Sequence, residues 1–221
     1  EGGGVGGQTA KLRAKFLYRI WEWAGRHNLV GFDVNPWVDA VKVKVEKTRR
    51  EPFTTAEVGK ILSEVPMMEW ARLTAWIAAY TGARIDSVRH LCWEDIDWQK
   101  SQIRFRRSKT TPYRIPMAAK LREKLEPLRK ESGPVVEELL TYTPPYCSRH
   151  FREKCEAMGI ANACFHRFRH TANTRLIEMG VSREHAIRLL HHKSISANDI
   201  YDHAETVEMA AVVEKLDYSV V

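Results

Sequence analysis

The segment His166–Leu176 reads HRFRHTANTRL and carries two histidines and three arginines in a stretch that otherwise has the composition of an ordinary helix. Three uses of so much positive charge and imidazole on one short helix are open. The segment could hold a metal ion, form a solvated charged face, or line a pocket for a phosphate group. The rest of the chain has to distinguish among them.

A metal site is the first alternative. His166 and His170 stand four residues apart, so a helix places both rings on one face, which is a workable spacing for zinc. The zinc-protease pattern needs a Glu directly after the first His, and Arg167 occupies that position. No acidic third ligand lies near in the sequence. We therefore expect no metal site here.

A phosphate pocket is the alternative that other segments support. His166 and Arg169 are three residues apart and share a helix face. Arg presents a planar fork of donors that matches two phosphate oxygens, and His can donate or move a proton near neutral pH. Matching groups occur elsewhere in the chain: Arg84 in TGARID, Lys109 in a basic turn, and His192 and Tyr201 in LLHHKSISANDIYDH.

The chain divides by composition into a short first part and a long second part. Residues 1–10, which begin EGGGVGGQ, are expected to be a flexible tail. A helix is predicted over 11–30, because apolar side chains recur there at helical spacing. Asn35 begins NPW, which turns the chain. We expect a partial helical domain over 11–39, a polar and basic linker over 40–51, and the main domain over 52–221.

The main domain reads as mainly α with a small three-stranded antiparallel sheet, an α+β class. Thr54 and Glu57 form a capping box at one helix start, and a second helix from Met68 ends at Gly82. The period then becomes alternating in WEDIDW, QIRFRR and YRIPM, which predicts three strands with a turn over 108–112. Further helices are predicted over 118–130, 147–158, 166–179 and 182–190, and Ser196 can cap another that carries Tyr201.

Composition favours a polyanionic partner. The 221 residues are 44% apolar, enough for a sizeable core, and carry a formal net charge of +7. Residues 100–130 contain eleven Lys or Arg against two Glu. The four cysteines include no CxxC pair, which argues against a zinc ribbon and fits reduced thiols. Without a signal peptide or an apolar run of membrane-spanning length, we expect a cytoplasmic protein with no membrane partner.

Three segments together resemble the tyrosine recombinases, the phage integrase family of site-specific DNA recombinases. They are 81–97 (TGARIDSVRHLCWEDID), 108–116 (SKTTPYRIP) and 166–203, where HxxRHT, LLxH and a Tyr nine residues later occur in family order. The resemblance extends from about Arg50 to the C terminus and implies that family's catalytic-domain fold. Residues 11–39 resemble the end of its helical core-binding domain, most of which is absent, so the chain is expected to be a fragment.

The resemblance implies a role for each group. Tyr201 would attack a DNA phosphodiester and form a 3′-phosphotyrosyl link. Arg84 and Arg169 would grip the non-bridging oxygens, and Lys109 would protonate the leaving 5′-oxygen. His166 would assist proton transfer, and His192 would donate a hydrogen bond to the phosphate. No metal, ATP or other cofactor is implied. The arginines Arg104, Arg106, Arg107 and Arg114 are expected to contact the DNA backbone or to be simply solvated.

Two positions depart from the family pattern. The family usually has an acidic residue three positions after the first arginine, where this chain has Ser87, preceded by Asp86. The family usually has Gly before the final histidine, where this chain has His191. These departures keep open a DNA-binding regulator that has lost catalysis on the same scaffold. A type IB topoisomerase, which shares the chemistry, is a further alternative.

The partners implied by the resemblance are double-stranded DNA and further copies of the chain. Recombinases of this family usually work as tetramers on two DNA sites, in a bacterial host cytoplasm, with possible accessory DNA-bending proteins. Residues 205–221 carry an apolar stripe that includes Val207 and Val213. We expect this segment to pack on a neighbouring protomer; the alternative is that it folds back on its own domain.

Overall fold

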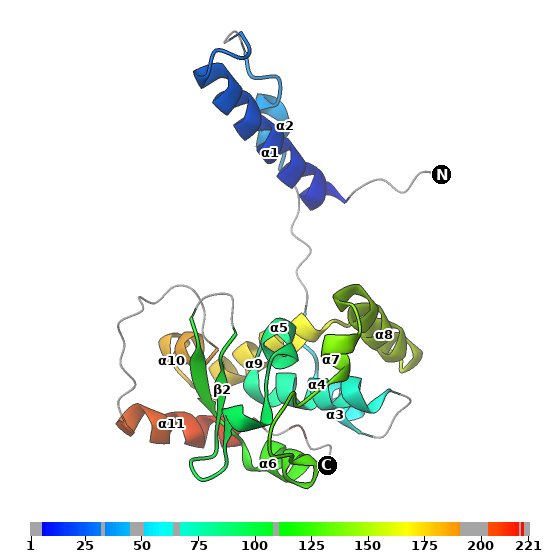
Figure 1. The fold of residues 1–221 in the computed structure, drawn as a ribbon, viewed down its shortest axis with the longest axis vertical. Coiled ribbons are helices and arrows are strands. Elements are labelled where there is room, and N and C mark those ends of the chain that lie inside the picture. Colours follow the sequence, from blue (N-terminus) through cyan, green and yellow to red (C-terminus); the bar gives the residue numbers. More distant parts are fainter. Residues whose placement is uncertain are drawn as a thin grey trace. The chain divides into compact units, whose positions relative to one another are not determined.

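The protein divides into two compact units, Glu1–Arg49 and Arg50–Val221, in a computed structural model (Figure 1). The described residues are 6–31, 34–44, 51–63, 67–107, 111–190, 203–216 and 218, with only the backbone described for 187, 188 and 203–208. Most of the described chain is helical, and the strands form one small antiparallel sheet in the second unit. The predicted fold class is therefore confirmed.

The first unit contains α1 (Gly7–Arg26) and α2 (Val38–Lys42). The helix predicted over 11–30 is present, although its last residues form a turn. The NPW turn follows from the Asn35 side chain, whose oxygen accepts from the Trp37 amide at 3.0 Å. Helix α2 overlaps the first residues of the predicted linker, and the domain bounds stay a prediction. The apolar stripe of α1 is exposed, with Phe16 66% accessible.

The second unit begins with α3 (Thr55–Leu62), α4 (Glu69–Thr81) and α5 (Ile85–Arg89). The capping box at α3 is confirmed: the Glu57 amide donates to Thr54 Oγ1 at 3.1 Å, and the Thr54 amide donates to a Glu57 carboxylate oxygen at 2.8 Å. Helix α4 is buried along nearly its whole length. It ends at Gly82 in a left-handed conformation, with φ +61°, as predicted.

The three predicted strands form a sheet in the order β1-β2-β3, and both pairings are antiparallel. The strands are β1 (Ile96–Asp97), β2 (Gln102–Phe105) and β3 (Tyr113–Pro116). The first is shorter than predicted because a 3₁₀ turn, η1 (Trp93–Asp95), occupies its start. Ile103 and Phe105 are fully buried while Arg104 is exposed, so the alternating pattern correctly gave the two faces.

The remaining helices are α6 (Ala119–Leu125), the 3₁₀ turn η2 (Glu126–Leu128), α7 (Glu138–Thr141), α8 (Pro144–Ala157), α9 (Phe165–Glu178), α10 (Arg183–Leu189) and α11 (His203–Glu214). The prediction of one continuous helix over 118–130 was wrong. Pro127 lacks an amide hydrogen and cannot continue an α-helix, so η2 replaces the last turns. Helix α7 was not predicted. Helix α8 starts earlier than predicted, because Thr143 caps it and Pro144 suits its first position.

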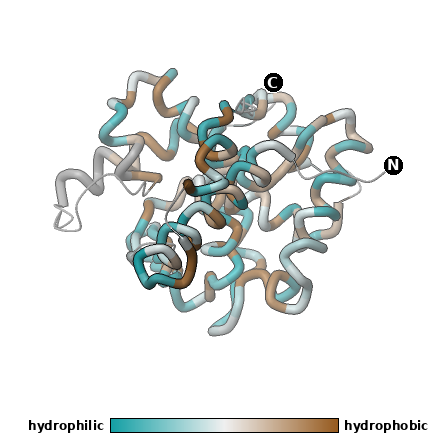
Figure 2. Tube along the Cα trace, turned by 90° about the horizontal axis from the view of Figure 1, so that it is seen from above, coloured by the Kyte–Doolittle hydropathy of each residue, from teal (hydrophilic) through white to brown (hydrophobic). Residues whose placement is uncertain are grey.

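Helices α4 and α9 pack against each other at the centre of the second unit. Brown and teal segments alternate along the helices, as expected for elements with one buried face (Figure 2). This arrangement fixes the two chain segments that carry Arg84 and Arg169 against a common core. No described helix has the length and apolarity that a membrane crossing requires.

The C-terminal segment folds back on its own unit. Helix α11 lies beside β3, and Val213, Leu216 and Tyr218 are buried in the core. The Tyr218 hydroxyl donates to the Ala79 carbonyl at 3.1 Å, and a Glu214 carboxylate oxygen accepts from the amide of residue 119 at 2.8 Å. The alternative that the segment folds back on its own domain therefore holds for Val213, Leu216 and Tyr218, while a contact with a neighbouring protomer stays a prediction.

Candidate functional site

Helix α9 supplies the first two groups of the predicted phosphate pocket. Its buried face carries Phe168 and Arg169, while His166 and His170 are exposed. The aromatic ring of Phe168 is fully buried against Phe53 and α8, which fixes the rotation of the helix about its own axis. That rotation directs Arg169 inward, toward the end of α4.

Arg169 is the central residue of this region. Only 2% of its surface is accessible. Its Nη1 donates to the Gly82 carbonyl at 2.9 Å, and its Nη2 donates to the Leu190 carbonyl. Its Nε is buried and has no hydrogen-bond partner among the described residues. One guanidinium thus links the end of α4 to the end of α10. In the sequence, Arg84 follows α4, and the segment with His192 and Tyr201 follows α10.

Gly82 permits this close approach. A side chain at this position would place its Cβ 2.2 Å from the Leu190 Cδ2 atom and 3.4 Å from the Ala172 Cβ atom. The backbone also has a positive φ of +61°, which residues with a side chain rarely adopt. A glycine is therefore needed both for the end of α4 and for the contact with α10.

Arg84 is the second cation. It is the N-cap residue of α5, with extended backbone angles, and its side chain is half-buried. Burial and the nearby positive charge of Arg84 lower the pKa of Arg169 to about 10, and Tyr113 acts in the opposite direction. Arg169 therefore stays charged at neutral pH but lacks a compensating carboxylate in the described part of the chain. Two neighbouring cations of this kind favour a bound anion.

The exposed histidines do not form a metal cluster with other ligands. The rings of His166 and His170 meet edge to face, with their centroids 4.9 Å apart. Within the described ranges, no group of three or more His, Cys, Asp and Glu side chains is arranged to hold a metal ion. His166 lies one turn before Arg169 on α9, and its role stays a prediction.

Three of the six predicted catalytic residues lie outside the described residues. Lys109 falls in 108–110, and His192 and Tyr201 fall in 191–202, together with the departure at His191. The described chain on either side shows where these segments attach. Strands β2 and β3 flank the first, and α10 and α11 flank the second. The structure brings Arg84 and Arg169 near each other, and the catalytic roles of all six residues stay predictions.

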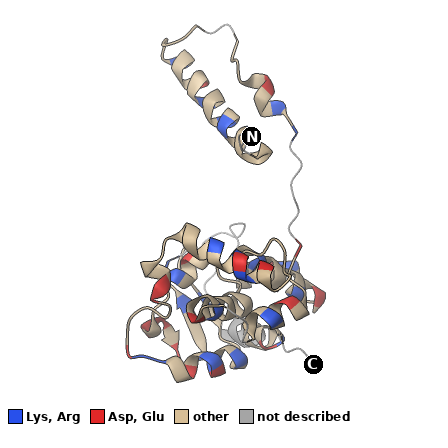
Figure 3. Ribbon diagram, turned by 90° about the vertical axis from the view of Figure 1, so that its right-hand side faces the viewer, with Lys and Arg blue, Asp and Glu red and all other residues tan. Residues whose placement is uncertain are grey.

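The arginines of the sheet have acidic neighbours. Arg106 forms an ion pair with Asp95, whose side chain is 1% accessible. Asp95 also accepts from the Cys92 amide at 3.2 Å. Arg104 and Arg114 are exposed and directly opposite each other across β2 and β3. Basic and acidic segments alternate over this unit (Figure 3). A groove of about 290 Å³ runs along this face and is lined by Glu94, Asp95, Ile96, Asp97, Gln102, Arg104, Arg106 and Arg114.

The departure at residue 87 has a structural consequence. Ser87 is buried, while Asp86 is exposed and faces Arg107, with 3.8 Å between a carboxylate oxygen and the Arg107 Nε. Asp86 forms no ion pair with Arg84 among the described interactions. Asp86 therefore does not replace the usual acidic residue beside the first arginine, and Arg84 is held by its position at the start of α5.

Some residues of this region could not be found from the sequence. The two carbonyls that hold Arg169 belong to the backbone, which carries no residue-type signal. Tyr113 reads only as a strand residue. Arg167, next to the first histidine, is buried and donates to the Glu51 carbonyl at 3.0 Å and to the Ala161 carbonyl at 2.7 Å. It anchors the start of the second unit to α9.

Comparison with known proteins agrees with this geometry. Residues 51–208 match the phage integrase family. Tyrosine recombinase XerA of Pyrococcus furiosus is 26% identical over 191 residues, which cover 78% of this chain and 66% of the relative. The chain therefore spans just under two thirds of that relative's length.

Two solved structures show the same fold. The integrase of mycobacterium phage Brujita superposes with a TM-score of 0.67 at 20% identity, covering 99% of this chain and 75% of that one. A lambda integrase tetramer bound to a Holliday junction superposes with a TM-score of 0.64 at 24% identity, covering 87% of this chain and 60% of that one.

Proposed function

Because this chain belongs to the phage integrase family, we propose that it is a site-specific DNA recombinase that cuts and rejoins strands through a covalent tyrosine intermediate. Family membership supports DNA recombination as the process. The catalytic mechanism and the independence of metal and ATP are part of the proposal. So are the substrate and the partners, since the chain spans only part of its relative.

The observation that carries the proposal is the pair Arg84 and Arg169. Burial and mutual repulsion make this pair unfavourable without an anion, as the lowered pKa of Arg169 indicates. A phosphodiester offers two non-bridging oxygens that each carry negative charge. Guanidinium groups bind such oxygens by charge-assisted hydrogen bonds, and they stay charged throughout a reaction. The same groups stabilise the additional charge of a five-coordinate phosphorus in the transition state.

In the proposed step one bond to phosphorus forms as another breaks, and two protons move, one from Tyr201 and one to the leaving oxygen. The Tyr201 oxygen attacks phosphorus, the bond from phosphorus to the 5′-oxygen breaks, and Lys109 gives that oxygen a proton. The products are a 3′-phosphotyrosine and a free 5′-hydroxyl. His166 assists the transfer of the tyrosine proton, and His192 donates a hydrogen bond to the phosphate. A 5′-hydroxyl from a second strand then reverses the step, so the energy of the bond is kept.

The binding of DNA follows from the same unit. Arg104 and Arg114 are exposed on adjacent strands, where their guanidinium groups can contact phosphates. Arg106 and Arg107 are engaged with acidic or polar neighbours and contribute less to binding. By similarity to the lambda integrase tetramer on a Holliday junction, we propose a tetramer on two duplexes as the active form, in the cytoplasm of a bacterial host. Accessory DNA-bending proteins could add to such a complex.

The test needs no knowledge of the target sequence. The protein is incubated with supercoiled plasmid in EDTA, denatured with detergent, and examined for relaxed plasmid and for a protein–DNA adduct. A Tyr201→Phe variant is treated in parallel. We expect relaxation and an adduct with the original protein and neither with the variant.

The outcomes separate the alternatives. Activity that survives in Tyr201→Phe would overturn the assignment of the nucleophile. DNA binding without any adduct would support a regulator on the same scaffold. Relaxation without strand exchange between two cognate sites would support a topoisomerase.

A further inference from the structure

Asp86, His90 and Arg107 form a cluster that joins α5 to the end of β2. Arg107 Nη1 lies 2.9 Å from His90 Nε2, and Arg107 Nε lies 3.8 Å from a carboxylate oxygen of Asp86. His90 Nδ1 lies 2.8 Å from the Asp86 backbone carbonyl and 3.8 Å from its carboxylate. The three side chains therefore connect two elements that are separated in the sequence by η1 and β1.

The hydrogen bonds define the state of the His90 ring. A carbonyl oxygen can only accept, so Nδ1 must carry the hydrogen that faces the Asp86 carbonyl. A guanidinium can only donate, so Nε2 must offer its lone pair to Arg107. The neutral imidazole with hydrogen on Nδ1 satisfies both contacts at once. His90 thus acts as a bridge between the backbone of α5 and the guanidinium of Arg107.

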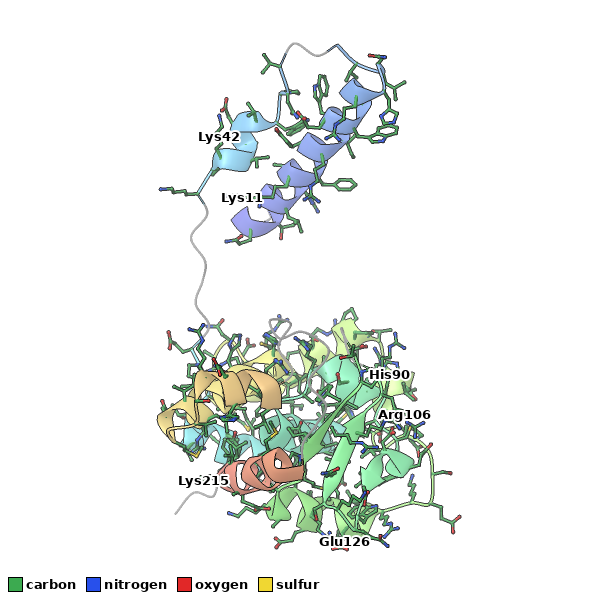
Figure 4. The ribbon with its side chains drawn as sticks, turned by 90° about the vertical axis from the view of Figure 1, so that its left-hand side faces the viewer. Lys11, Lys42, His90, Arg106, Glu126 and Lys215 are labelled. Atoms are coloured by element: carbon green, nitrogen blue, oxygen red, sulfur yellow. The ribbon has the colours of Figure 1, made fainter. Side chains whose placement is uncertain are left out.

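A second contact, an ion pair between Arg106 and Asp95, also holds the chain just after β2. Arg106, the preceding residue, pairs with the buried Asp95 of η1. His90 and Arg106 lie at one end of the sheet, with Glu126 toward the opposite end (Figure 4). Two consecutive arginines therefore fix the end of β2 to η1 and to α5. In the sequence, Lys109 follows Arg107 by two residues.

We propose that Arg107, held by His90 and Asp86, is a positioning residue for Lys109. This cluster of Asp86, His90 and Arg107, called the brace below, ties the start of the segment that carries Lys109 to α5, the helix that follows Arg84. It thereby sets the distance between the group that protonates the leaving oxygen and the group that grips the phosphate. This inference rests on the proposed function, because it concerns the general acid of that reaction. It also gives Asp86 a role other than contact with Arg84.

The exposure of the cluster suits a role in positioning rather than in stability. The Asp86 and Arg107 side chains are 60% and 64% accessible, and ion pairs of this kind contribute little to folding. Substitution should therefore leave the fold intact. A displacement of a catalytic group by about 1 Å can nevertheless lower a rate by about 100-fold.

The test uses a DNA substrate in which sulfur replaces the 5′-oxygen at the cleaved bond. A thiolate leaves without protonation, so this substrate does not need a general acid. Single-turnover rates of adduct formation are compared on the oxygen and sulfur substrates for Arg107→Gln, Lys109→Ala, Arg84→Gln and Arg104→Gln. Arg104→Gln is the matched control, because it removes the same charge from β2, three residues before Arg107.

We expect Arg107→Gln to lose about 10- to 100-fold in rate on the oxygen substrate and to recover most of that loss on the sulfur substrate. Lys109→Ala should behave in the same way with a larger loss. Arg84→Gln and Arg104→Gln should show no recovery specific to sulfur. A His90→Ala/Arg107→Gln double variant should be no slower than Arg107→Gln alone, because both changes break one connection.

The arms distinguish the two proposals. If the sulfur substrate restores the rate of Lys109→Ala but not that of Arg107→Gln, Arg107 does not position Lys109, and Lys109 is still supported as the general acid. An unchanged rate for Arg107→Gln on the oxygen substrate would also overturn the brace. No recovery of Lys109→Ala would overturn the general-acid assignment in the proposed function, and with it a brace that acts through that acid.

Discussion

Two arginine-rich regions of this protein differ in how their charge is compensated. The stretch 100–130 has eleven Lys or Arg against two Glu, yet its cations Arg106, Arg107 and Lys130 pair with carboxylates from other segments. Arg106 pairs with Asp95, and Lys130 pairs with Glu137 at 2.8 Å. Arg84 and Arg169 lie far apart in the sequence but close in the fold, and no described carboxylate pairs with either.

The difference teaches that the number of cations in a stretch is a poor guide to an anion site. A salt bridge can bring its acid from anywhere in the chain, so the net charge of one segment says little about its surroundings. Burial of a cation without an acid is more informative, because it costs stability that a ligand can offset. Substitutions at Arg169 and Arg84 should therefore act on the reaction, and substitution of the ion-paired Arg106 should act on stability.

The largest effect is expected from Arg169→Gln. This change removes a charge from the phosphate pocket and weakens the links to the Gly82 and Leu190 carbonyls. Adduct formation at saturating DNA should slow by about 100- to 1000-fold, since one preorganised donor is typically worth about 3 kcal/mol. Single-turnover assays measure the rate. A loss below about threefold would show that Arg169 is only structural.

Among glycine-to-alanine substitutions, Gly82→Ala should lower the free energy of unfolding most. The new Cβ would overlap Leu190 and would occupy a backbone conformation with positive φ. We expect a loss of about 2–4 kcal/mol in the free energy of unfolding. Gly180→Ala is the matched control, because its φ is +80° but no atom lies within 4 Å of the added Cβ. It should cost about 1 kcal/mol. Equal losses in thermal denaturation would contradict the close contact.

Arg106→Gln and Arg104→Gln should differ in effect, although Arg106 directly follows the strand β2 that carries Arg104. Arg106→Gln leaves the buried carboxylate of Asp95 without its cation and should cost about 1–2 kcal/mol of stability. Arg104→Gln should leave stability unchanged. It should lower by about one the slope of the logarithm of the DNA-binding constant against the logarithm of the salt concentration. Thermal denaturation and binding isotherms at several salt concentrations measure both. A loss of stability in Arg104→Gln and a reduced salt dependence in Arg106→Gln would mean that Arg104 stabilises the fold and Arg106 contacts DNA.

The smallest effect is stabilisation by inorganic sulfate. Sulfate bound between Arg84 and Arg169 should raise the melting temperature by about 2–4 °C near ten times its dissociation constant. Because sulfate also stabilises proteins non-specifically, the comparison is with Arg84→Gln at the same ionic strength. The specific part should vanish in that variant. An identical rise in both proteins would argue against an anion site at this pair.

The sequence predicted most elements of the second unit because their signals are local. The capping box at Thr54, the left-handed end at Gly82 and the alternation around Arg104 each depend on a few adjacent residues. The single helix predicted over 118–130 followed from helical periodicity and neglected Pro127, which ends the α-helix. The apolar stripe within 205–221 did not reveal which surface covers it, and the structure shows that Val213 is covered by its own unit.

The site was predictable in part. Motif order pointed to Arg84 and Arg169, whose closeness the structure supports. The carbonyl acceptors of Arg169 and the bridge through His90 depend on tertiary packing and on backbone groups, which no residue pattern encodes. The roles of Lys109, His192 and Tyr201 remain predictions.

The most direct test of the central claim measures two quantities in two variants. Arg84→Gln and Arg104→Gln each remove one positive charge from the second unit. For each variant, the dissociation constant for duplex DNA and the rate of adduct formation at saturating DNA are determined. The account predicts that Arg84→Gln lowers the rate by about 100-fold or more with a small change in affinity, and that Arg104→Gln weakens binding while the saturated rate persists. Equal effects of both variants on the rate would contradict the claim that the buried pair holds the reacting phosphate.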